Sequence, residues 1–383
     1  MQFLQQSFAV SFDYKVFFTT AVFSRDNTLI ADFFKELGPD ISSRKLLFVI
    51  DEGVEKAHPD LLESIKDYFA VHSGPQLVDH FIIVKGGEET KNNDTQLNKI
   101  LEATNKYGID RHSYLAAIGG GAVLDMAGYA AAIAHRGVKL IRIPTTVLSQ
   151  NDSGVGVKNS INHFNKKNFL GTFRPPVAVF NDDLFLHTLD DRNWRAGISE
   201  AVKVALIKDA PFFLWIQEHA AALNRRDSAA MEKLIFECAR LHMEHIAGAD
   251  PFESGSSRPL DFGHWSAHKM EQLTRYELLH GEAVAIGIAL DTIYSFLVDY
   301  LPEADMLQVV RLLLDLGFEL EHPVLAQTNS LLTGLHEFSE HLGGRLTIML
   351  LEGIGKGIDV HDIDQEKFIQ AVHMLKTLTK KEM

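Results

Sequence analysis

Residues 114–125 read YLAAIGGGAVLD, a short apolar run that passes through three glycines into a second apolar run. Tyr114–Ile118 has the length and composition of a buried β-strand, and Ala122–Ala134 has helical spacing. The whole stretch Tyr114–Ala134 carries a single charge, Asp125, but the glycines interrupt the continuity that a membrane-spanning helix needs. The stretch therefore predicts a buried strand, a glycine turn and a buried helix.

Strand-like and helical runs alternate on both sides of this unit. Further strands are expected at Lys45–Ile50, Phe81–Val84 and Lys139–Ile143, and further helices at Pro59–Ala70 and Asn92–Lys106. Repeated βαβ units imply a parallel sheet that is covered on both faces. We predict a Rossmann-like α/β domain over residues 1–188.

Strand signals nearly vanish from about Leu189 onward. Helical periodicity dominates there, and the segments that carry it are Ile198–Lys208, Ser228–Ala247, His264–Arg275 and Gly281–Val298. A short piece, Arg345–Leu351, is expected to be extended, and Asp250–Ser257 has the composition of a loop. We predict an all-α domain over residues 189–383.

Composition and charge narrow the class of protein. The 383 residues include 37 Lys and Arg against 51 Asp and Glu, a net charge of −14 that disfavours nucleic acid as a partner. The one cysteine, Cys238, permits neither an intramolecular disulfide nor a multi-cysteine zinc cluster and suits a reducing compartment. The first residues lack the pattern of a signal peptide. We expect a cytoplasmic protein with no membrane partner.

The glycines at 119–121 lie between a predicted strand and a predicted helix, where backbone N–H groups can approach a pyrophosphate. Asp51 ends an earlier strand, where a carboxylate can bind ribose hydroxyls, and Gly87–Lys91 follows another. The triplet is not the G-x-G-x-x-G fingerprint. A tight turn under close packing remains the alternative interpretation.

A second cluster is basic although the chain is acidic. Between residues 136 and 174 one acid, Asp152, stands against seven positive residues: Arg136, Lys139, Arg142, Lys158, Lys166, Lys167 and Arg174. Asn, Ser, Thr and Gly fill the spaces between them and add hydrogen-bond donors, which suits a phosphorylated, hydroxyl-rich small molecule. The alternative is a solvated basic surface loop.

A third group could bind a metal ion. His264 and His268 are four residues apart, so a helix would place them on one face. Glu200 and His280 are further candidates. With 18 histidines in the chain, a structural or surface pair is the alternative for His264 and His268, and the pairs His187/His219 and His242/His245 receive no function.

Taken in order, these motifs resemble the 3-dehydroquinate synthase family of sugar phosphate cyclases over nearly the whole chain, and also a subgroup named EboD. The stretches that carry the resemblance are Gly87–Lys91, Gly119–Asp125, His135–Val138, Pro144–Val157, Lys167–Asn168, Ser199–Lys203, Gly263–His268 and His280–Val284. The resemblance implies a nucleotide-binding α/β domain, a helical domain that holds a divalent metal, usually zinc, a substrate cleft between them, and a homodimer.

The resemblance also implies roles for individual residues. The metal ligands would be Glu200, His264 and His280. NAD contacts would come from Asp51, Glu88, Lys91, Gly119, Gly120, Gly121, Asp125, Thr145 and Thr146. Catalytic contacts to a phosphorylated sugar would come from Asp152, Lys158, Asn168, Lys203 and His268, and further substrate contacts from Lys167, Asp261 and Arg136, the last delivered across the dimer interface.

In this family a ring hydroxyl is oxidised by NAD⁺, phosphate leaves by β-elimination, the ketone is reduced again, and an intramolecular aldol addition closes a carbocycle. The chain departs from the family where members that form dehydroquinate bind a substrate carboxylate. The expected lysine is His242, the expected arginine falls at Ser257 with Arg258 one place away, and the expected asparagine is Asp261. A further lysine aligns with Phe338–Glu340.

Cyclases of neutral seven-carbon sugar phosphates, such as 2-epi-5-epi-valiolone synthases, depart in the same way. We therefore expect an NAD- and metal-dependent phosphate lyase whose substrate is not the carboxylate-bearing heptulosonate phosphate. The alternatives are a polyol dehydrogenase of the glycerol dehydrogenase type and a catalytically inactive protein that binds NAD or metal.

Overall fold

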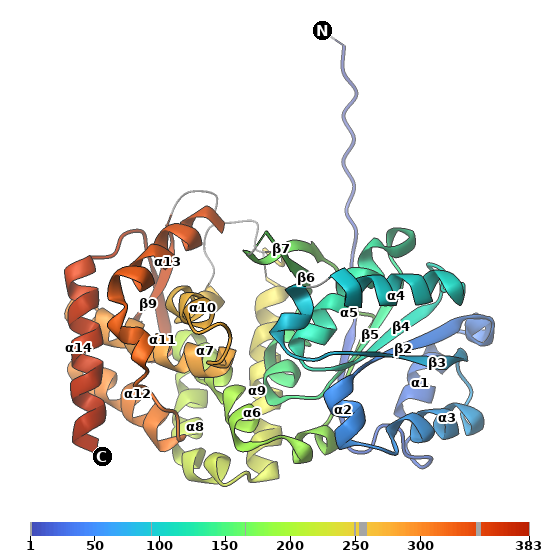
Figure 1. Ribbon diagram of the computed structural model, residues 1–383, viewed down its shortest axis with the longest axis horizontal. Coiled ribbons are helices and arrows are strands. Elements are labelled where there is room, and N and C mark those ends of the chain that lie inside the picture. Colours follow the sequence, from blue (N-terminus) through green and yellow to red (C-terminus); the bar gives the residue numbers. More distant parts are fainter. Residues whose placement is uncertain are drawn as a thin grey trace. The chain divides into compact units, whose positions relative to one another are not determined.

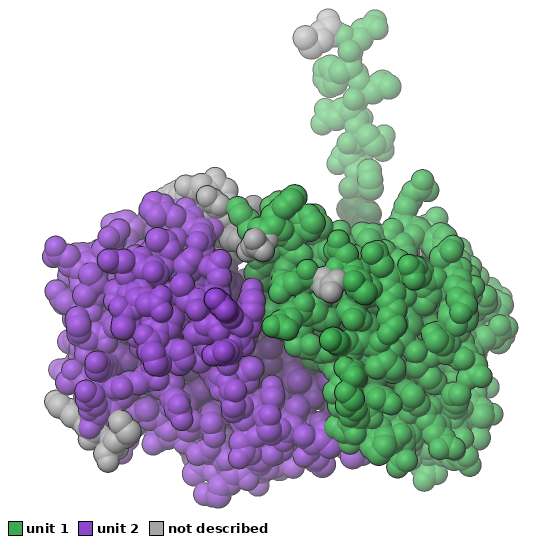
Figure 2. Space-filling model, viewed as in Figure 1, with its two compact units in different colours: residues 1–144, 157–182 green, residues 145–156, 183–383 purple. Residues whose placement is uncertain are grey.

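The computed structural model describes residues 2–92, 94–164, 166–248, 250–252, 259–341 and 346–382. The chain forms two compact units, coloured separately in Figure 2: residues 1–144 with 157–182, and residues 145–156 with 183–383. The second unit thus takes the segment 145–156 from within the range that the sequence assigned to the first domain. The predicted boundary after residue 188 lies six residues beyond the last crossing of the chain, at residue 182.

The first unit is built on a six-stranded sheet in which every strand pairs parallel with its neighbours, in the order β1-β8-β5-β4-β2-β3. Its strands are β1 (Lys15–Thr19), β2 (Lys45–Asp51), β3 (Gln76–Val84), β4 (Tyr114–Gly119), β5 (Lys139–Pro144) and β8 (Ala178–Asp182). Its helices are α1 (Leu29–Glu36), α2 (Glu52–Ala57), α3 (Leu61–Val71), α4 (Asp94–Lys106) and α5 (Gly121–Ile133), with short helices η1 (Pro39–Ser43), η2 (Glu88–Asn92) and η3 (Ala134–Arg136).

Helices cover both faces of this sheet (Figure 1). Successive side chains of a strand point to opposite faces, so each face has a core of its own. On one face Leu47 and Leu115 join the apolar core of α4 and α5. On the other, Tyr114 packs edge-on against Phe34 of α1 and Phe48 against Phe69 of α3. Because all the strands are parallel, their carboxyl ends lie at one edge of the sheet. Asp51 ends β2 at this edge, and Gly119–Gly121 lie where β4 ends.

An antiparallel hairpin, β6 (Lys158–His163) and β7 (Lys166–Phe173), follows in the first unit. Much of the basic segment is thus regular structure and not the surface loop of the alternative interpretation. Arg142, counted there as a possible phosphate ligand, is fully buried in β5. Its Nη2 donates to Lys158 O (2.9 Å) and Asn159 Oδ1 (2.7 Å), so it fixes the root of the hairpin.

The second unit is helical. Its helices are α6 (Asp191–Ala196), α7 (Ile198–Lys208), α8 (Ala210–Asn224), α9 (Ser228–Ile246), α10 (His264–Leu273), α11 (His280–Leu297), α12 (Glu303–Asp315), α13 (Thr328–His341) and α14 (Gln365–Glu382), with shorter turns η4 (Ser149–Ser153), η5 (Asp183–Thr188), η6 (Pro259–Asp261) and η7 (Pro323–Ala326). The extended piece expected at Arg345–Leu351 is confirmed in its described part by β9 (Ile348–Gly353), and β10 (Lys356–Val360), which was not expected, pairs with it in an antiparallel ribbon. Arg345 lies outside the described residues.

Helix α11 is the centre of this unit. Fourteen of its eighteen residues are buried, and its apolar side chains belong to one core with those of α7, α9 and α10. Because its first residue is His280, the packing of α11 also places a candidate metal ligand. Within the described part of the chain, no helix has the combination of length and apolar character that crossing a membrane requires.

Candidate active site

Three helices of the second unit bring the candidate metal ligands together. Glu200 lies on α7 and is 1% exposed, while His264 and His280 are the first residues of α10 and α11. Nε2 of His264 is 3.4 Å from Glu200 Oε1, and Nε2 of His280 is 3.5 Å from the same oxygen. Residues separated by up to eighty positions thus bring ligand atoms within 4.8 Å of one another.

The donor set fits a divalent metal. Four ligands arranged tetrahedrally at about 2.1 Å from a zinc ion lie about 3.4 Å from one another, close to both observed separations. The other ring nitrogens are already engaged: His264 Nδ1 bonds to Phe262 O at 3.0 Å and His280 Nδ1 to Glu271 Oε2 at 3.1 Å. If each Nδ1 carries the proton, each Nε2 offers a lone pair, the state that metal binding requires.

Charge around Glu200 is balanced by Lys203, one helical turn further along α7, whose Nζ is 2.5 Å from Glu200 Oε2. Burial alone would raise the pKa of Glu200, but the charge of Lys203 opposes it, and that pKa lies well below its usual value. Burial would lower the pKa of Lys203, yet Glu200 and Asp152 raise it. Glu200 is therefore an anion, the form that binds a cation.

Asp152, Lys203, His268 and Asp261 surround this ligand set. His268 lies one turn after His264 on α10, with ring centroids 5.5 Å apart, and 5.9 Å from the ring of His280. Asp152 Oδ1 is 2.7 Å from His242 Nδ1. His242, to which spacing gave no function, is therefore the partner of a predicted catalytic carboxylate.

Asp291 of α11 fixes the start of α10. Its carboxylate accepts hydrogen bonds from Gly263 N (2.9 Å) and Trp265 Nε1 (3.0 Å), on either side of His264. Burial raises the pKa of Asp291 to about 7, against the two hydrogen bonds that lower it. Gly263 has φ +76°, and a Cβ on Gly287 would lie 2.0 Å from Gly263 O. The two helices thus meet backbone to backbone beside the metal ligand.

The glycine turn of the first unit fits a dinucleotide phosphate. Gly120 is the N-cap of α5, so the N–H groups of Gly121 and Ala122 precede the first hydrogen bonds within the helix, which Val123 and Leu124 donate to Gly120 O, and they lie at the carboxyl edge of the sheet. Asp51 caps α2 through Gly53 N (2.8 Å), and burial raises its pKa although hydrogen bonds from Gly53, Val54 and Gly120 lower it. A Cβ on Gly119 would meet Val123 at 3.0 Å, so close packing explains part of the glycine preference.

A buried lysine joins three other predicted residues of the first unit. Lys91, 3% exposed, donates to Asp125 Oδ2 at 2.8 Å and to Asn168 Oδ1, and its Nζ lies 3.7 Å from Glu88 Oε1. Asp125 and Glu88 supply the negative charge that a buried ammonium needs. Predicted cofactor residues and a predicted substrate residue therefore share one hydrogen-bond network.

The remaining predicted residues lie elsewhere. Thr145 and Thr146 follow β5 and belong to the second unit, where Thr146 N donates to Ser149 Oγ at 3.0 Å. Arg136 is exposed with φ +63° in the turn after α5, and Lys158 and Lys167 lie on the hairpin. Ser257 and Arg258, where relatives that form dehydroquinate are expected to have an arginine that binds the substrate carboxylate, lie outside the described residues.

Sequence reasoning missed several supporting residues: Glu271, Asp291, Ser160 and Asn162. A signal existed for Glu271, because it is seven residues after His264 and three after His268, on the same helical face. For Asp291 no local signal existed, since its partners lie more than twenty-five residues away in the sequence.

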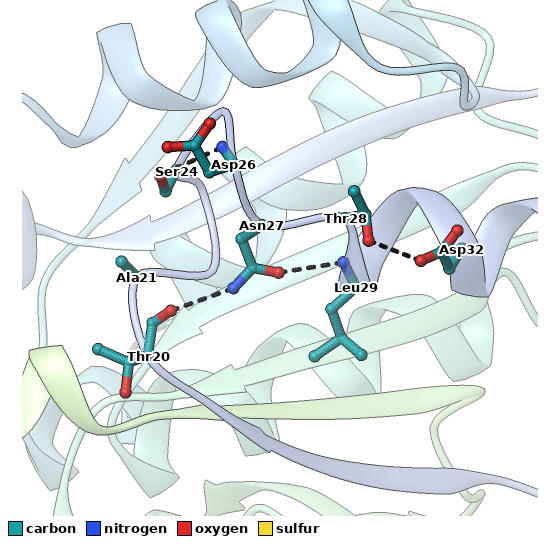
Figure 3. A pocket seen from close by; sticks show the side chains of 8 residues that line it. All are labelled: Thr20, Ala21, Ser24, Asp26, Asn27, Thr28, Leu29 and Asp32. Atoms are coloured by element: carbon teal, nitrogen blue, oxygen red, sulfur yellow. Dashed lines mark hydrogen bonds between the residues drawn. The ribbon is translucent and has the colours of Figure 1, made fainter.

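The first unit also has an open hollow of about 500 Å³ between β1 and α1, shown in Figure 3. None of the predicted site residues lines it. Its polar groups bond to one another, as in Asn27 Nδ2 to Thr20 O and Thr28 Oγ1 to Asp32 Oδ2. We assign it no function.

Comparison with known proteins decides the family. Residues 81–196 match the N-terminal domain of 3-dehydroquinate synthase, and residues 197–337 match its C-terminal domain. The chain belongs to the 3-dehydroquinate synthase family. The 3-dehydroquinate synthase of Azotobacter vinelandii is 38% identical over 330 residues, which are 86% of this chain and 87% of that protein. The enzyme of the same name from Nitrosospira multiformis is 39% identical over 300 residues, 78% of this chain and 80% of that protein.

Two solved structures share the fold of this chain. ValA, the 2-epi-5-epi-valiolone synthase from Streptomyces hygroscopicus subsp. jinggangensis with NAD⁺ and Zn²⁺ bound, is 29% identical with a TM-score of 0.88 and covers 98% of this chain and 99% of that one. A 2-deoxy-scyllo-inosose synthase shares the fold at 23% identity and a TM-score of 0.78, over 94% and 96% of the two chains. The family and the fold class expected from the sequence are thus confirmed.

Proposed function

We propose that this member of the 3-dehydroquinate synthase family is an NAD- and divalent-metal-dependent sugar phosphate cyclase, a lyase that eliminates phosphate and closes a carbocycle. The observation that carries the proposal is the set of Glu200, His264 and His280, whose ligand atoms lie within 4.8 Å of one another. Family membership over most of the chain adds the reaction class.

Glu200, His264 and His280 would hold the metal, with zinc as the expected ion. Two nitrogens and one carboxylate leave coordination positions open, which is the catalytic pattern, and the ion would supply Lewis acidity toward a substrate hydroxyl. Lys203 stays cationic beside Glu200 and can orient a ring hydroxyl. Asp152, held by His242, can accept a hydrogen bond from another ring hydroxyl of the substrate.

The first unit would bind NAD at the start of α5, with Asp51 toward a ribose. The cofactor would accept and return one hydride in each turnover, so that no net NADH forms. Lys158, Lys167 and Asn168 on the hairpin supply donors for a phosphate, and we assign His268 of α10 to the same leaving group. Thr145, Thr146, Glu88 and Asp125 remain proposed cofactor contacts, and Arg136 a proposed contact from a partner subunit of a cytoplasmic homodimer.

We further propose that the substrate is a sugar phosphate without a carboxylate. Three carboxylates act on Lys203, namely those of Glu200, Asp152 and Asp261. Where dehydroquinate-forming relatives would place a lysine, His242 bonds to Asp152. A bound metal would neutralise Glu200, but a substrate carboxylate beside Asp152 and Asp261 would still lack the lysine expected at His242, and a missing partner costs roughly 1–3 kcal/mol.

Phosphate release tests both statements. Purified, metal-loaded protein with NAD⁺ should release phosphate from sedoheptulose 7-phosphate or glucose 6-phosphate faster than from the carboxylate-bearing heptulosonate phosphate. Turnover of the heptulosonate at kcat/KM on the order of 10⁴ M⁻¹s⁻¹ would overturn the substrate class, leaving the cyclase assignment in place.

The same assay separates the cyclase from its rivals. Accumulation of NADH in step with product, without phosphate, would indicate a polyol dehydrogenase. The probable glycerol dehydrogenase from Sinorhizobium meliloti shares only the fold, at 15% identity and a TM-score of 0.63 over 96% and 98% of the two chains. Failure to retain metal or to bind NAD⁺ would contradict the proposal.

A further inference from the structure

Asn168 is an exposed residue near the start of β7, and its side chain can present two opposite ends to a ligand. An amide oxygen only accepts hydrogen bonds, whereas the amide nitrogen only donates. A phosphate accepts through nearly all of its oxygens, so it binds one end of the amide and is repelled by the other. What fixes this amide therefore decides whether Asn168 can serve a phosphorylated substrate.

Two donors hold the oxygen end of the amide. Nζ of Lys91 donates to Asn168 Oδ1, and Oγ of Ser160 donates to the same oxygen at 2.9 Å, a shorter distance than the 3.3 Å from this Oγ to Asp125 Oδ2. An ammonium group has donors and no acceptor, so only the oxygen of the amide can face it. Lys91 and Ser160 are 3% and 6% exposed, which keeps water from competing for these bonds.

The backbone of Asn168 is held as well. Its N–H donates to Asn162 Oδ1 at 2.8 Å, and Asn162 Nδ2 donates to Glu88 Oε1 at 3.1 Å. Asn168 has φ +56°, a left-handed conformation that asparagine adopts more readily than most residues. Neither the backbone nor the amide is therefore free to turn over without breaking hydrogen bonds.

We propose that Lys91 and Ser160 are positioning residues that lock the amide of Asn168 so that its NH₂ group is presented to the substrate phosphate. Within the part of the chain that the structure describes, no hydrogen bond uses Asn168 Nδ2, and the residue is exposed. The inference rests on the proposed role of Asn168 as a phosphate contact. It gives Lys91 a task on the substrate side besides its proposed cofactor contact.

Binding of inorganic phosphate, measured by calorimetry on the metal-loaded protein, tests the lock. We expect Asn168→Ala to weaken phosphate binding roughly tenfold, the size of one hydrogen bond to a charged group. Asn168→Asp should weaken it further, because the lysine still takes one oxygen and the second, charged oxygen then faces the phosphate. Ser160→Ala should weaken it by a smaller factor.

A double-mutant cycle separates the lock from the charge of Lys91. Lys91→Met removes both the lock and the positive charge. The charge attracts phosphate whether or not Asn168 is present, whereas the lock matters only when Asn168 is present. We expect the two substitutions together to weaken phosphate binding by less than the product of their separate factors. Metal content and NAD⁺ affinity, measured on every variant, report on folding and on the cofactor contact.

Two results would contradict the proposal, one its phosphate contact and the other the lock. If Asn168→Ala leaves phosphate binding unchanged, the proposed phosphate contact fails and the lock fails with it. A second result would be that Asn168→Ala weakens phosphate binding, Ser160→Ala does not, and the effects of Lys91→Met and Asn168→Ala multiply. The phosphate contact would then stand, and the lock would be wrong. If Lys91→Met does not fold, Ser160→Ala in the presence and absence of Asn168→Ala gives the same test.

Discussion

At the scale of single residues, the candidate metal centre depends on what lies behind each ligand. Phe262 O and Glu271 engage the Nδ1 atoms of His264 and His280, so both rings are oriented before any ion arrives. Such outer partners typically change metal affinity 10–100-fold. The site is therefore preorganised by groups that the ligand spacing alone does not reveal.

Removal of one imidazole should empty the site. We expect purified His264→Ala and His280→Ala to lose more than about a hundredfold in metal affinity, because a three-ligand site retains only two protein donors. Metal content by mass spectrometry and the visible spectrum of the Co²⁺-loaded protein measure this. His373→Ala, on the exposed surface of α14, is the matched control and should keep its metal. Equal metal in all three variants would refute the assignment.

The candidate ligands Glu200, His264 and His280 could be proposed from the family resemblance, whereas residue type and spacing alone left the histidines open as structural residues; in the structure their ligand atoms lie within 4.8 Å of one another. The partners of these residues could not be proposed. His242 meets Asp152 through packing of α9 against η4, and Asp291 meets Gly263 across α11 and α10. Such pairs follow from tertiary contacts, which a local pattern does not encode.

At the scale of elements, the sequence predicted helices and buried strands where apolar residues recur at a regular helical spacing or form a continuous run. The sequence placed α7 at its observed bounds and β2, β4 and β5 within one residue at each end. It missed β1, β8 and the β6–β7 hairpin. β1 is a sheet edge with a mixed burial pattern, and the hairpin is rich in Lys, Asn and Ser, so neither offers a strong apolar period.

The contact of α11 with α10 depends on a glycine, and adding one methyl group tests it. A Cβ at residue 287 would lie 2.0 Å from Gly263 O, and backbone cannot yield as a side chain can. We expect Gly287→Ala to destabilise the protein by about 1–3 kcal/mol or more and to weaken metal binding, because Gly263 precedes His264. Thermal unfolding and metal titration measure the two effects.

Gly353→Ala is the control for this prediction. Among the described residues other than its two chain neighbours, no atom lies within 4 Å of a Cβ at residue 353, so the same methyl group should leave the unfolding temperature and the metal affinity nearly unchanged. Identical unfolding curves for the two variants would show that the close approach of α10 and α11 does not constrain the site.

At the scale of the whole molecule, the chain divides its proposed chemistry between two compact units. The first holds the glycine turn, Lys91 and the hairpin, and the second holds the metal ligands together with the segment 145–156. The sequence predicted two domains, but a single boundary cannot describe a chain that crosses three times. The unit to which a short segment belongs depends on which apolar core buries its side chains. Val147, in the segment 145–156, belongs to the core of the second unit.

The proposed homodimer can be tested by mixing two inactive variants, one in each unit. Arg136 is exposed in a turn where His135, Arg136 and Gly137 all have positive φ, and we propose that it reaches the site of the partner subunit. Arg136→Ala and His264→Ala should each be inactive alone. In a mixed dimer, however, the site with an intact His264 receives the intact Arg136 of the other subunit, and one of the two sites works.

Random mixing makes half of the dimers heterodimers, so unfolding and refolding the two variants together should restore about a quarter of the wild-type phosphate release. A mixture of His264→Ala with His280→Ala should restore much less if Glu200, His264 and His280 of one subunit form the metal set, because every site then lacks a ligand. Size-exclusion chromatography with light scattering verifies that the mixtures are dimers. Dimers that remain inactive in the first mixture would mean that Arg136 serves its own subunit or none.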